Sequence, residues 1–235
     1  MNLMMLSATL GERFYTAFFA ERRYMLYLKG VGNTLLITVF ALLLGIVIGL
    51  FVSLVRFTTK NKPGLRWAYH ICQGYINLVR GTPVMVQILI FYNVIFSSSG
   101  IDPVFSAIAC FGINSGAYVA EIFRAGIESV DSGQMEAART LGLSYRTSMR
   151  SIVIPQAVKN ILPTLGNEFI SLLKETAIVG VISIVDITRA SQLVSASSFD
   201  IFPPLMIISA IYLILVLGLS KMLNIFEKRM AGDNV

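Results

Sequence analysis

The sequence predicts an all-α polytopic membrane protein with about five transmembrane helices. The first observation is composition: 55% of the 235 residues are apolar and only 14% are charged, and the mean hydropathy is +0.73. Soluble globular domains average about 45–50% apolar and about 25% charged residues. The second observation is the length of the uncharged runs. Together they exclude a disordered chain, a coiled coil and a disulfide-stapled secreted domain.

Each predicted span follows from one such run. A helix needs roughly 20 apolar residues to cross a hydrocarbon core of about 30 Å. Four runs between charged residues meet this length and predict spans at about 30–55, 81–101, 103–122 and 201–222. A fifth span is predicted at about 165–187, although it contains Glu168, Lys174 and Glu175. Charged side chains at mid-membrane depth are costly, so we expect these three to face other helices, a wet cavity or the cytoplasmic interface.

The distribution of Lys and Arg predicts the orientation. Loops 56–66 and 123–160 and the C-terminal tail are basic, whereas 97–103 has no Lys or Arg and 187–202 has only Arg189. Basic loops favour the cytoplasmic side. We therefore expect a cytoplasmic C-terminus, with 230–235 as a cytoplasmic tail.

The N-terminal segment 1–27 then lies outside the cell or at the membrane surface, although it carries Arg13, Arg22 and Arg23. Its apolar residues recur near helical spacing, so residues 3–20 are interpreted as an interfacial helix.

No enzyme site is visible in the sequence. It contains no phosphate-binding loop, nucleophile elbow or metal-ligand cluster, so we expect no catalytic residue, no metal and no cofactor in this chain. Cys72 and Cys110 are interpreted as packing residues, and His70 as an interfacial anchor. The formal charge of +6 is explained by the basic loops of a membrane protein rather than by binding to nucleic acid.

Residues 131–155, between the third and fourth predicted spans, form a separate pattern. Asp131 can cap a helix, with Gln134 in the capping-box position, and Gly142 is placed to end it in a left-handed turn. Ser144 can cap a second short helix, which Pro155 helps to end. This rigid helix–glycine–helix element, residues 131–155, is called the knob below. It suggests a docking surface for a soluble partner. It presents Glu136, Arg139 and Arg146.

Four stretches of the sequence now carry a resemblance to a known family. Glu136-Ala137-Ala138, then Gly142, then Ile152-Val153-Ile154-Pro155 resembles the EAA loop of the membrane permeases of bacterial ATP-binding-cassette (ABC) importers, with Ile154 in place of the usual leucine. Arg80-Gly81-Thr82-Pro83 with Gln87, residues 117–124, and residues 165–176 resemble the polar amino-acid branch, the histidine/glutamine/arginine-type permeases. Glu175 stands where many relatives have aspartate. The resemblance covers about 28–229.

The resemblance implies the type I importer architecture and an assembly of several chains. Two permease subunits, a second copy or a paralogue, form the pathway, two ATPase subunits bind ATP and Mg²⁺, and an extracytoplasmic binding protein delivers a polar amino acid. The membrane is the bacterial cytoplasmic membrane, and the partners include its lipid. The residues implied in coupling to the ATPase are Glu136, Ala137, Ala138, Arg139, Gly142, Arg146 and Pro155.

Polar residues inside the predicted spans are candidates for the substrate pathway, because an apolar side chain would be less costly there. They are Gln87, Asn114, Glu121, Glu168 and Thr176. A zwitterionic amino acid needs acceptors for its ammonium and donors for its carboxylate, which these side chains can supply. The alternative is interhelical hydrogen bonding or, for Glu121, the cytoplasmic end of a span near Arg124.

Other interpretations stay open at this point. Gly45 and Gly49 form G-x-x-x-G, which predicts a close helix crossing inside or between subunits, or arises by chance. A secondary transporter driven by an ion gradient is the alternative function, although such proteins usually have internal repeats and more spans. A membrane scaffold would not need polar residues inside its spans. The motifs are shared by arginine, histidine, glutamine, glutamate and cystine systems.

Overall fold

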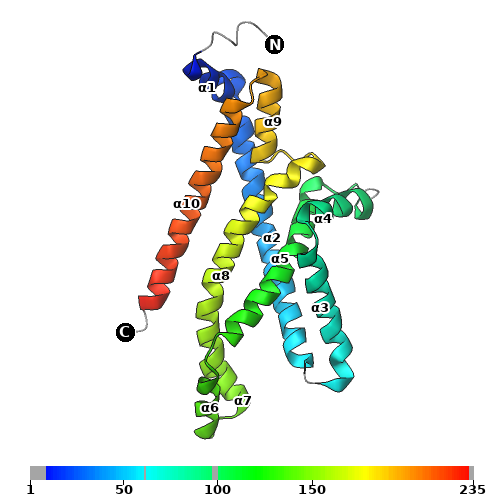
Figure 1. Cartoon of the computed structure of the whole chain (residues 1–235), viewed down its shortest axis with the longest axis vertical. Coiled ribbons are helices and arrows are strands. Elements are labelled where there is room, and N and C mark those ends of the chain that lie inside the picture. The colour runs from blue at the N-terminus through cyan, green and yellow to red at the C-terminus, as the bar shows by residue number, and fades with distance from the viewer. Residues whose placement is uncertain (1–8, 61, 97–99, 233–235) are drawn as a thin grey trace.

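The computed structural model describes residues 9–60, 62–96 and 100–232, and every regular element within these ranges is helical. The molecule is an elongated bundle (Figure 1). Five segments run along its long axis: α2 (Tyr24–Thr59), α3 (Arg66–Gly81), α5 (Pro103–Glu128), α8 (Ile154–Glu175) and α10 (Phe202–Gly232). Shorter helices cover the two ends. α1 (Leu10–Phe18) and α9 (Ile187–Ser198) lie at one end, and α6 (Ser132–Thr140) and α7 (Tyr145–Ser148) lie at the other.

Within the described ranges, α2, α5 and α10 are long and apolar enough to cross a membrane, and a fourth crossing results if the bent pair after α2 is counted as one span. The total of five spans stays a prediction. The alternation of the five long segments between the two ends of the bundle is compatible with it (Figure 1).

The span predicted at about 81–101 does not correspond to one straight helix in the structure. α3 ends at Gly81, and α4 (Val84–Ile90) with its π-helical continuation η4 (Phe91–Ile95) leaves it at an angle of 106°. Pro83 causes the break, because it lacks an N–H and disfavours helical geometry in the residue before it. Thr82 is accordingly extended, with φ −121° and ψ 145°. The long segment along the bundle is therefore α3, which begins at Arg66.

The fourth long helix is displaced from the predicted 165–187. α8 already begins at Ile154 and gives way at Thr176 to the 3-10 segment η6 (Thr176–Ile182). The N-terminal half of α8 carries polar residues and Lys159, so a search for uncharged runs does not include it. At the other end, Ser183 adopts a left-handed φ of +67° and stops the helical path.

Glycines on both helices allow α2 to pack closely against α5. A Cβ atom on Gly49 would lie 2.6 Å from the Val119 side chain, and one on Gly116 would lie 2.8 Å from Ile48. Gly45 faces Ser115 at a similarly short distance of 3.0 Å. Small residues let two membrane helices approach this closely. The G-x-x-x-G motif therefore forms a crossing inside the chain.

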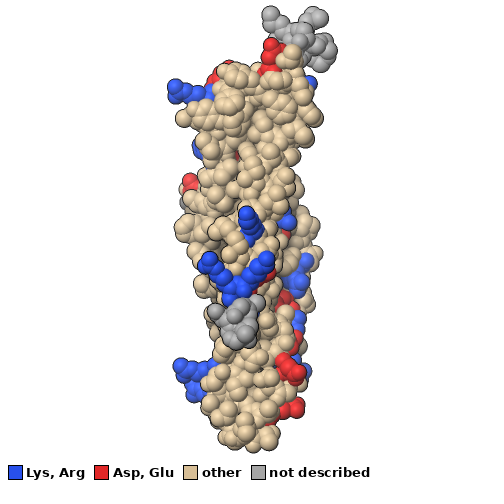
Figure 2. All heavy atoms as spheres, turned by 90° about the vertical axis from the view of Figure 1, so that its left-hand side faces the viewer, with Lys and Arg blue, Asp and Glu red and all other residues tan. Residues whose placement is uncertain are grey.

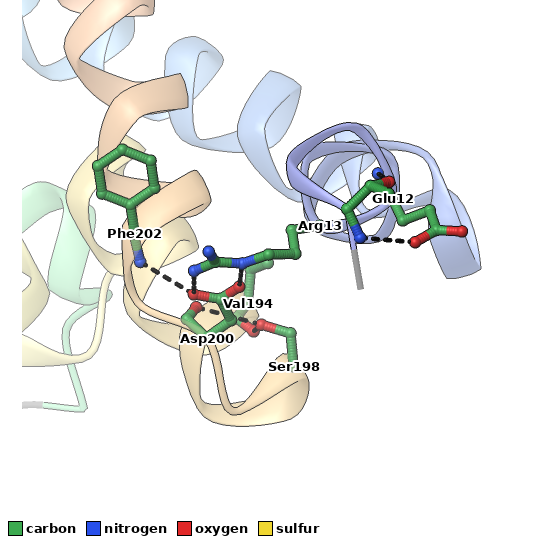
Figure 3. Close-up of polar contacts among 7 residues, drawn as sticks. Glu12, Arg13, Val194, Ser198, Asp200 and Phe202 are labelled. Atoms are coloured by element: carbon green, nitrogen blue, oxygen red, sulfur yellow. Dashed lines mark hydrogen bonds and ion pairs between the residues drawn. The ribbon is translucent and has the colours of Figure 1, made fainter. Parts of the chain in front are cut away.

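The N-terminal helix is fastened to the start of α10. The Arg13 guanidinium donates two hydrogen bonds to the Asp200 carboxylate, at 2.7 and 2.8 Å, and lies over the ring of Phe202 (Figure 3). Arg23 is buried and donates to the Thr16 carbonyl oxygen. Two of the basic residues that disagree with the predicted orientation are thus paired within the chain. Residues 3–8 of the expected interfacial helix lie outside the described residues.

Candidate functional site

The knob at the α6–α7 end is defined by its helix caps. The Asp131 carboxylate accepts a hydrogen bond from the Gly133 N–H at 2.7 Å, whereas the expected capping box would have involved Gln134. At the other end of α6, Gly142 has φ +85°. Its N–H donates to the Arg139 carbonyl oxygen, and the next N–H, of Leu143, donates to that of Ala138. This is the Schellman arrangement that ends a helix at glycine, as predicted.

The second half of the knob differs from the prediction. Ser144 caps α7 by accepting from the Thr147 N–H at 3.2 Å, as expected. Pro155 does not end the helix: α7 continues through the π-helical stretch η5 (Met149–Val153) into α8, and Pro155 lies in the first turn of α8. A proline is tolerated at this point of the helical path because the π-helical stretch before it already interrupts the regular α-helical hydrogen-bond pattern.

The side chains of the knob fall into two groups. Glu136, Ala137, Arg139, Gly142, Arg146 and Pro155 are exposed. Ala138 is 2% exposed, so its methyl group packs inside this chain and does not face a partner. Leu141 is 82% exposed at the tip of the knob. It was not among the predicted site residues, although an apolar residue just before a helix-stopping glycine is a recognisable signal.

Two of the predicted pathway residues bond to each other. The Asn114 side-chain N–H donates to the Gln87 side-chain oxygen at 2.9 Å. The Gln87 amide in turn donates to the Val79 carbonyl oxygen and to the Thr82 hydroxyl, both at 2.8 Å. These bonds bind the α3–α4 break to α5, so Gln87 and Asn114 serve as interhelical hydrogen-bonding residues. Thr176 is buried and donates to the Leu173 carbonyl oxygen within its own chain segment.

Glu121 belongs to an ion-pair network. Its carboxylate contacts both Arg56 of α2 and Arg124 of α5. Arg56 also donates to the Gln73 side-chain oxygen of α3 at 2.8 Å, and Arg124 also pairs with Glu128. The network therefore ties together α2, α3 and α5 toward the α6–α7 end, and the charge of Glu121 is balanced within the chain.

Glu168 lies in the wall of a cavity of about 590 Å³ between α3, α5 and α8. One of its carboxylate oxygens accepts a hydrogen bond from the Ser115 hydroxyl at 2.8 Å. The lining also includes Glu121 and Arg80, and the Arg80 guanidinium stacks 5.2 Å from the centre of the Tyr118 ring. Amide groups come from Asn160 and Asn167 of α8.

The cavity unites residues that the sequence did not bring together. Arg80 belonged to a family motif at the edge of a predicted span but was not among the predicted pathway residues, and Asn160 lay outside a predicted span. The cavity offers a carboxylate, a guanidinium and amides in a volume typical of small-molecule sites. Such a set can bind a small ligand that carries both charges, because carboxylates accept from ammonium groups and guanidinium donates to carboxylates.

A bundle of apolar helices, a charged cavity within it and a capped knob at one end define a membrane transport subunit. Residues 45–232 match the family described as the binding-protein-dependent transport system inner membrane component. The chain belongs to this family and is a permease subunit of an ABC importer in the membrane.

Curated relatives cover nearly the same length. The chain is 37% identical over 209 residues to the arginine transport system permease protein ArtQ of Bacillus subtilis, with 88% of this chain and 93% of that protein aligned. It is 39% identical over 204 residues to the putative glutamine transport system permease protein GlnP of Rickettsia conorii, with 86% and 91% aligned.

Solved structures agree on the fold. A chain in the crystal structure of an amino acid ABC transporter with histidines superposes with a TM-score of 0.81 at 43% identity, covering 88% of this chain and 94% of that one. A chain of the MetNI methionine ABC transporter in an inward-facing conformation superposes with a TM-score of 0.74 at 18% identity, covering 90% and 99%. The second likeness concerns the fold alone.

Proposed function

We propose that this permease carries a polar amino acid inward across the bacterial cytoplasmic membrane, using ATP hydrolysed by a separate subunit. The names of the relatives support the substrate class, since they include an arginine and a glutamine permease and an amino acid transporter crystallised with histidines. The partners are two ATPase subunits that hold ATP and Mg²⁺, a second permease chain and an extracytoplasmic binding protein. This chain itself makes and breaks no covalent bonds.

The substrate occupies the cavity between α3, α5 and α8. Glu168 accepts hydrogen bonds from an ammonium group of the amino acid, and Arg80 donates to its carboxylate. Both residues line the cavity, and they carry the complementary charges that a zwitterion requires. Charge-assisted hydrogen bonds of this kind are stronger than neutral ones and fix orientation.

The α6–α7 end faces the cytoplasm, and the C-terminus of α10 lies on that side. The basic loops of the sequence support this orientation. α10 runs from the α9 end toward the α6–α7 end (Figure 1). Figure 2 shows Lys and Arg side chains gathered near mid-height of the face that carries α10, with further ones toward the upper and the lower end.

The observation that carries the proposal is the knob itself, a short helix capped at both ends that presents Ala137 and Leu141 beyond the bundle. A helix held in this way transmits force without unwinding. We place the ATPase contact on this surface, together with the exposed charges of Glu136, Arg139 and Arg146.

The test is co-purification and reconstitution with the neighbouring ATPase and binding protein. Leu141→Asp should leave the permease folded but release the ATPase, and should abolish ATP-driven uptake in proteoliposomes. Leu65→Asp, an exposed apolar residue in the loop between α2 and α3, is the matched control and should retain both. Uptake that proceeds from an ion gradient without ATP would contradict the proposal in favour of a secondary transporter.

A further inference from the structure

A second cavity lies where α2, α3 and α5 approach α7. Its volume is about 730 Å³, and its lining runs from Ser53 to Lys60 on α2 and from Tyr69 to Arg80 on α3. The first residue of α7, Tyr145, closes it toward the knob. It shares Arg80 and Glu121, and with them α3 and α5, with the proposed substrate cavity, but it extends to α2 and α7 instead of α8.

The described lining of this cavity has an excess of positive charge. Four basic side chains reach it, Arg56, Lys60, Arg80 and Arg124, against two carboxylates, Glu121 and Glu128. Both carboxylates are already engaged: Glu121 contacts Arg56 and Arg124, and Glu128 contacts Arg124. The lining is therefore suited to an anion rather than to a further cation.

Arg56 contributes charge to this cavity rather than a free hydrogen-bond donor. Its side chain is 11% exposed, and its two terminal nitrogens bond to Glu121 and Gln73. Its Nε atom is buried and is not exposed to the cavity. Lys60, which has an exposed side chain, is therefore the basic residue best placed to donate to a ligand.

The surroundings of the cavity place it at the level of lipid headgroups. Phe57 lines the cavity, and it is exposed on the molecular surface, as are Trp67 and Ile71 nearby on α3. Tryptophan concentrates at membrane–water interfaces. Basic pockets between transmembrane helices on the cytoplasmic side bind the head groups of anionic lipids.

We propose that this cavity binds a phosphate group, held by Lys60 and attracted by the net positive charge of the lining. Its source is the head group of an anionic phospholipid of the cytoplasmic leaflet, whose acyl chains leave along Phe57. A soluble phosphate compound offers the same chemistry without the chains. The inference goes beyond the proposed function, since lipid binding is independent of which amino acid is carried.

The test is lipid retention by the intact transporter complex, measured by native mass spectrometry after delipidation and titration with phosphatidylglycerol or phosphatidylcholine. Phosphatidylglycerol should bind preferentially, and Lys60→Gln should weaken it about fivefold, as expected for one basic residue at an anionic surface. Lys62→Gln is the matched control, because Lys62 is also exposed and basic but outside the described lining. Lys60→Arg should preserve binding.

A titration with inorganic phosphate is the second part of the test. If phosphate displaces phosphatidylglycerol and stabilises the complex against heat in a Lys60-dependent way, the phosphate site is supported and its ligand is soluble. Equal retention of the two lipids, with no effect of inorganic phosphate, would overturn the inference. Equal losses of phosphatidylglycerol binding in Lys60→Gln and Lys62→Gln would also overturn the inference. None of these readouts requires transport, so a failure here is distinguishable from a failure of the importer proposal.

Discussion

Among the polar residues of the membrane segments, Glu168 differs in how its charge is compensated. Glu121 is balanced by two arginines, and Gln87 and Asn114 bond to each other. Glu168 accepts from the neutral Ser115 hydroxyl and faces the same cavity as Arg80. A carboxylate held by a hydroxyl in a cavity wall is available to an ammonium group of a ligand.

Glu168→Gln should therefore reduce transport of a cationic amino acid about tenfold, because a hydrogen bond to a charged group contributes about 1.5 kcal/mol or more. A neutral amino acid, whose side chain carries no cationic group, should be less affected. The measurement is the initial rate of ATP-driven uptake with saturating, substrate-loaded binding protein. Glu175→Gln, two turns further along α8, is the control. Equal losses for the cationic and the neutral substrate would remove the charge role of Glu168.

Replacing Ala137 or Ala138 of the knob with a larger residue should have different effects. Ala138 is buried within the chain, so Ala138→Trp overpacks the interior, at a cost of about 1–3 kcal/mol. Ala137 is exposed, so Ala137→Trp should leave the chain stable and uncouple ATP hydrolysis from uptake. Thermal unfolding and coupled uptake together distinguish the two. If Ala137→Trp transported normally, the docking surface would not include this side of α6.

At the scale of the elements, the α2–α5 crossing depends on the absence of side chains at its glycines. A methyl group on Gly49 would approach the backbone nitrogen of Ala120 to 2.8 Å, and backbone cannot yield as a flexible side chain can. Gly49→Ala should thus destabilise the bundle by about 1–3 kcal/mol. Gly32→Ala lies on the same helix with open space around it and should be neutral or slightly stabilising. Thermal denaturation in detergent compares the two.

The contact between α1 and α10 should depend on pH in one direction. The hydrogen bonds from Arg13 lower the pKa of Asp200 below its ordinary value. A lowered pKa means that the stabilisation is complete above the pKa of an unfolded aspartate, about 3.9, and is lost as pH falls through the lower folded value. α1 should stay attached from neutral to mildly acidic pH and detach only in strong acid.

Hydrogen exchange of the α1 amides, followed against pH, measures this attachment. Asp200→Asn should raise the exchange rate of α1 at neutral pH and remove the dependence on acid. Detachment of α1 in the native protein near pH 6 would contradict the assignment, since the carboxylate is fully ionised there.

The sequence was most informative where one residue decides the geometry. Gly142 ends α6 as predicted, because few residues other than glycine adopt its left-handed backbone conformation. It was less informative about helix bounds. The start of α8 is polar, so an uncharged run could not reveal it, and Pro155 begins a helix rather than ending one because a π-helical stretch precedes it.

At the scale of the whole molecule, the long apolar helices α2, α5 and α10 could be predicted, because they depend on local hydropathy. The cavities could not. Arg80, Tyr118, Asn160 and Glu168 come from three helices, and only the packing of those helices brings them to one wall. The same holds for the bond between Arg13 and Asp200, which joins opposite ends of the chain.

The glycine crossing has a consequence for biosynthesis. Its two halves, on α2 and α5, are separated in sequence by α3 and α4. During translation α2 leaves the ribosome and enters the bilayer before α5 exists, so its glycines face lipid rather than protein. The nascent chain forms the close contact between α2 and α5 only when α5 is inserted. A ribosome stalled before Pro103 therefore holds an unassembled product, in the form that membrane proteases and insertion chaperones would be expected to recognise.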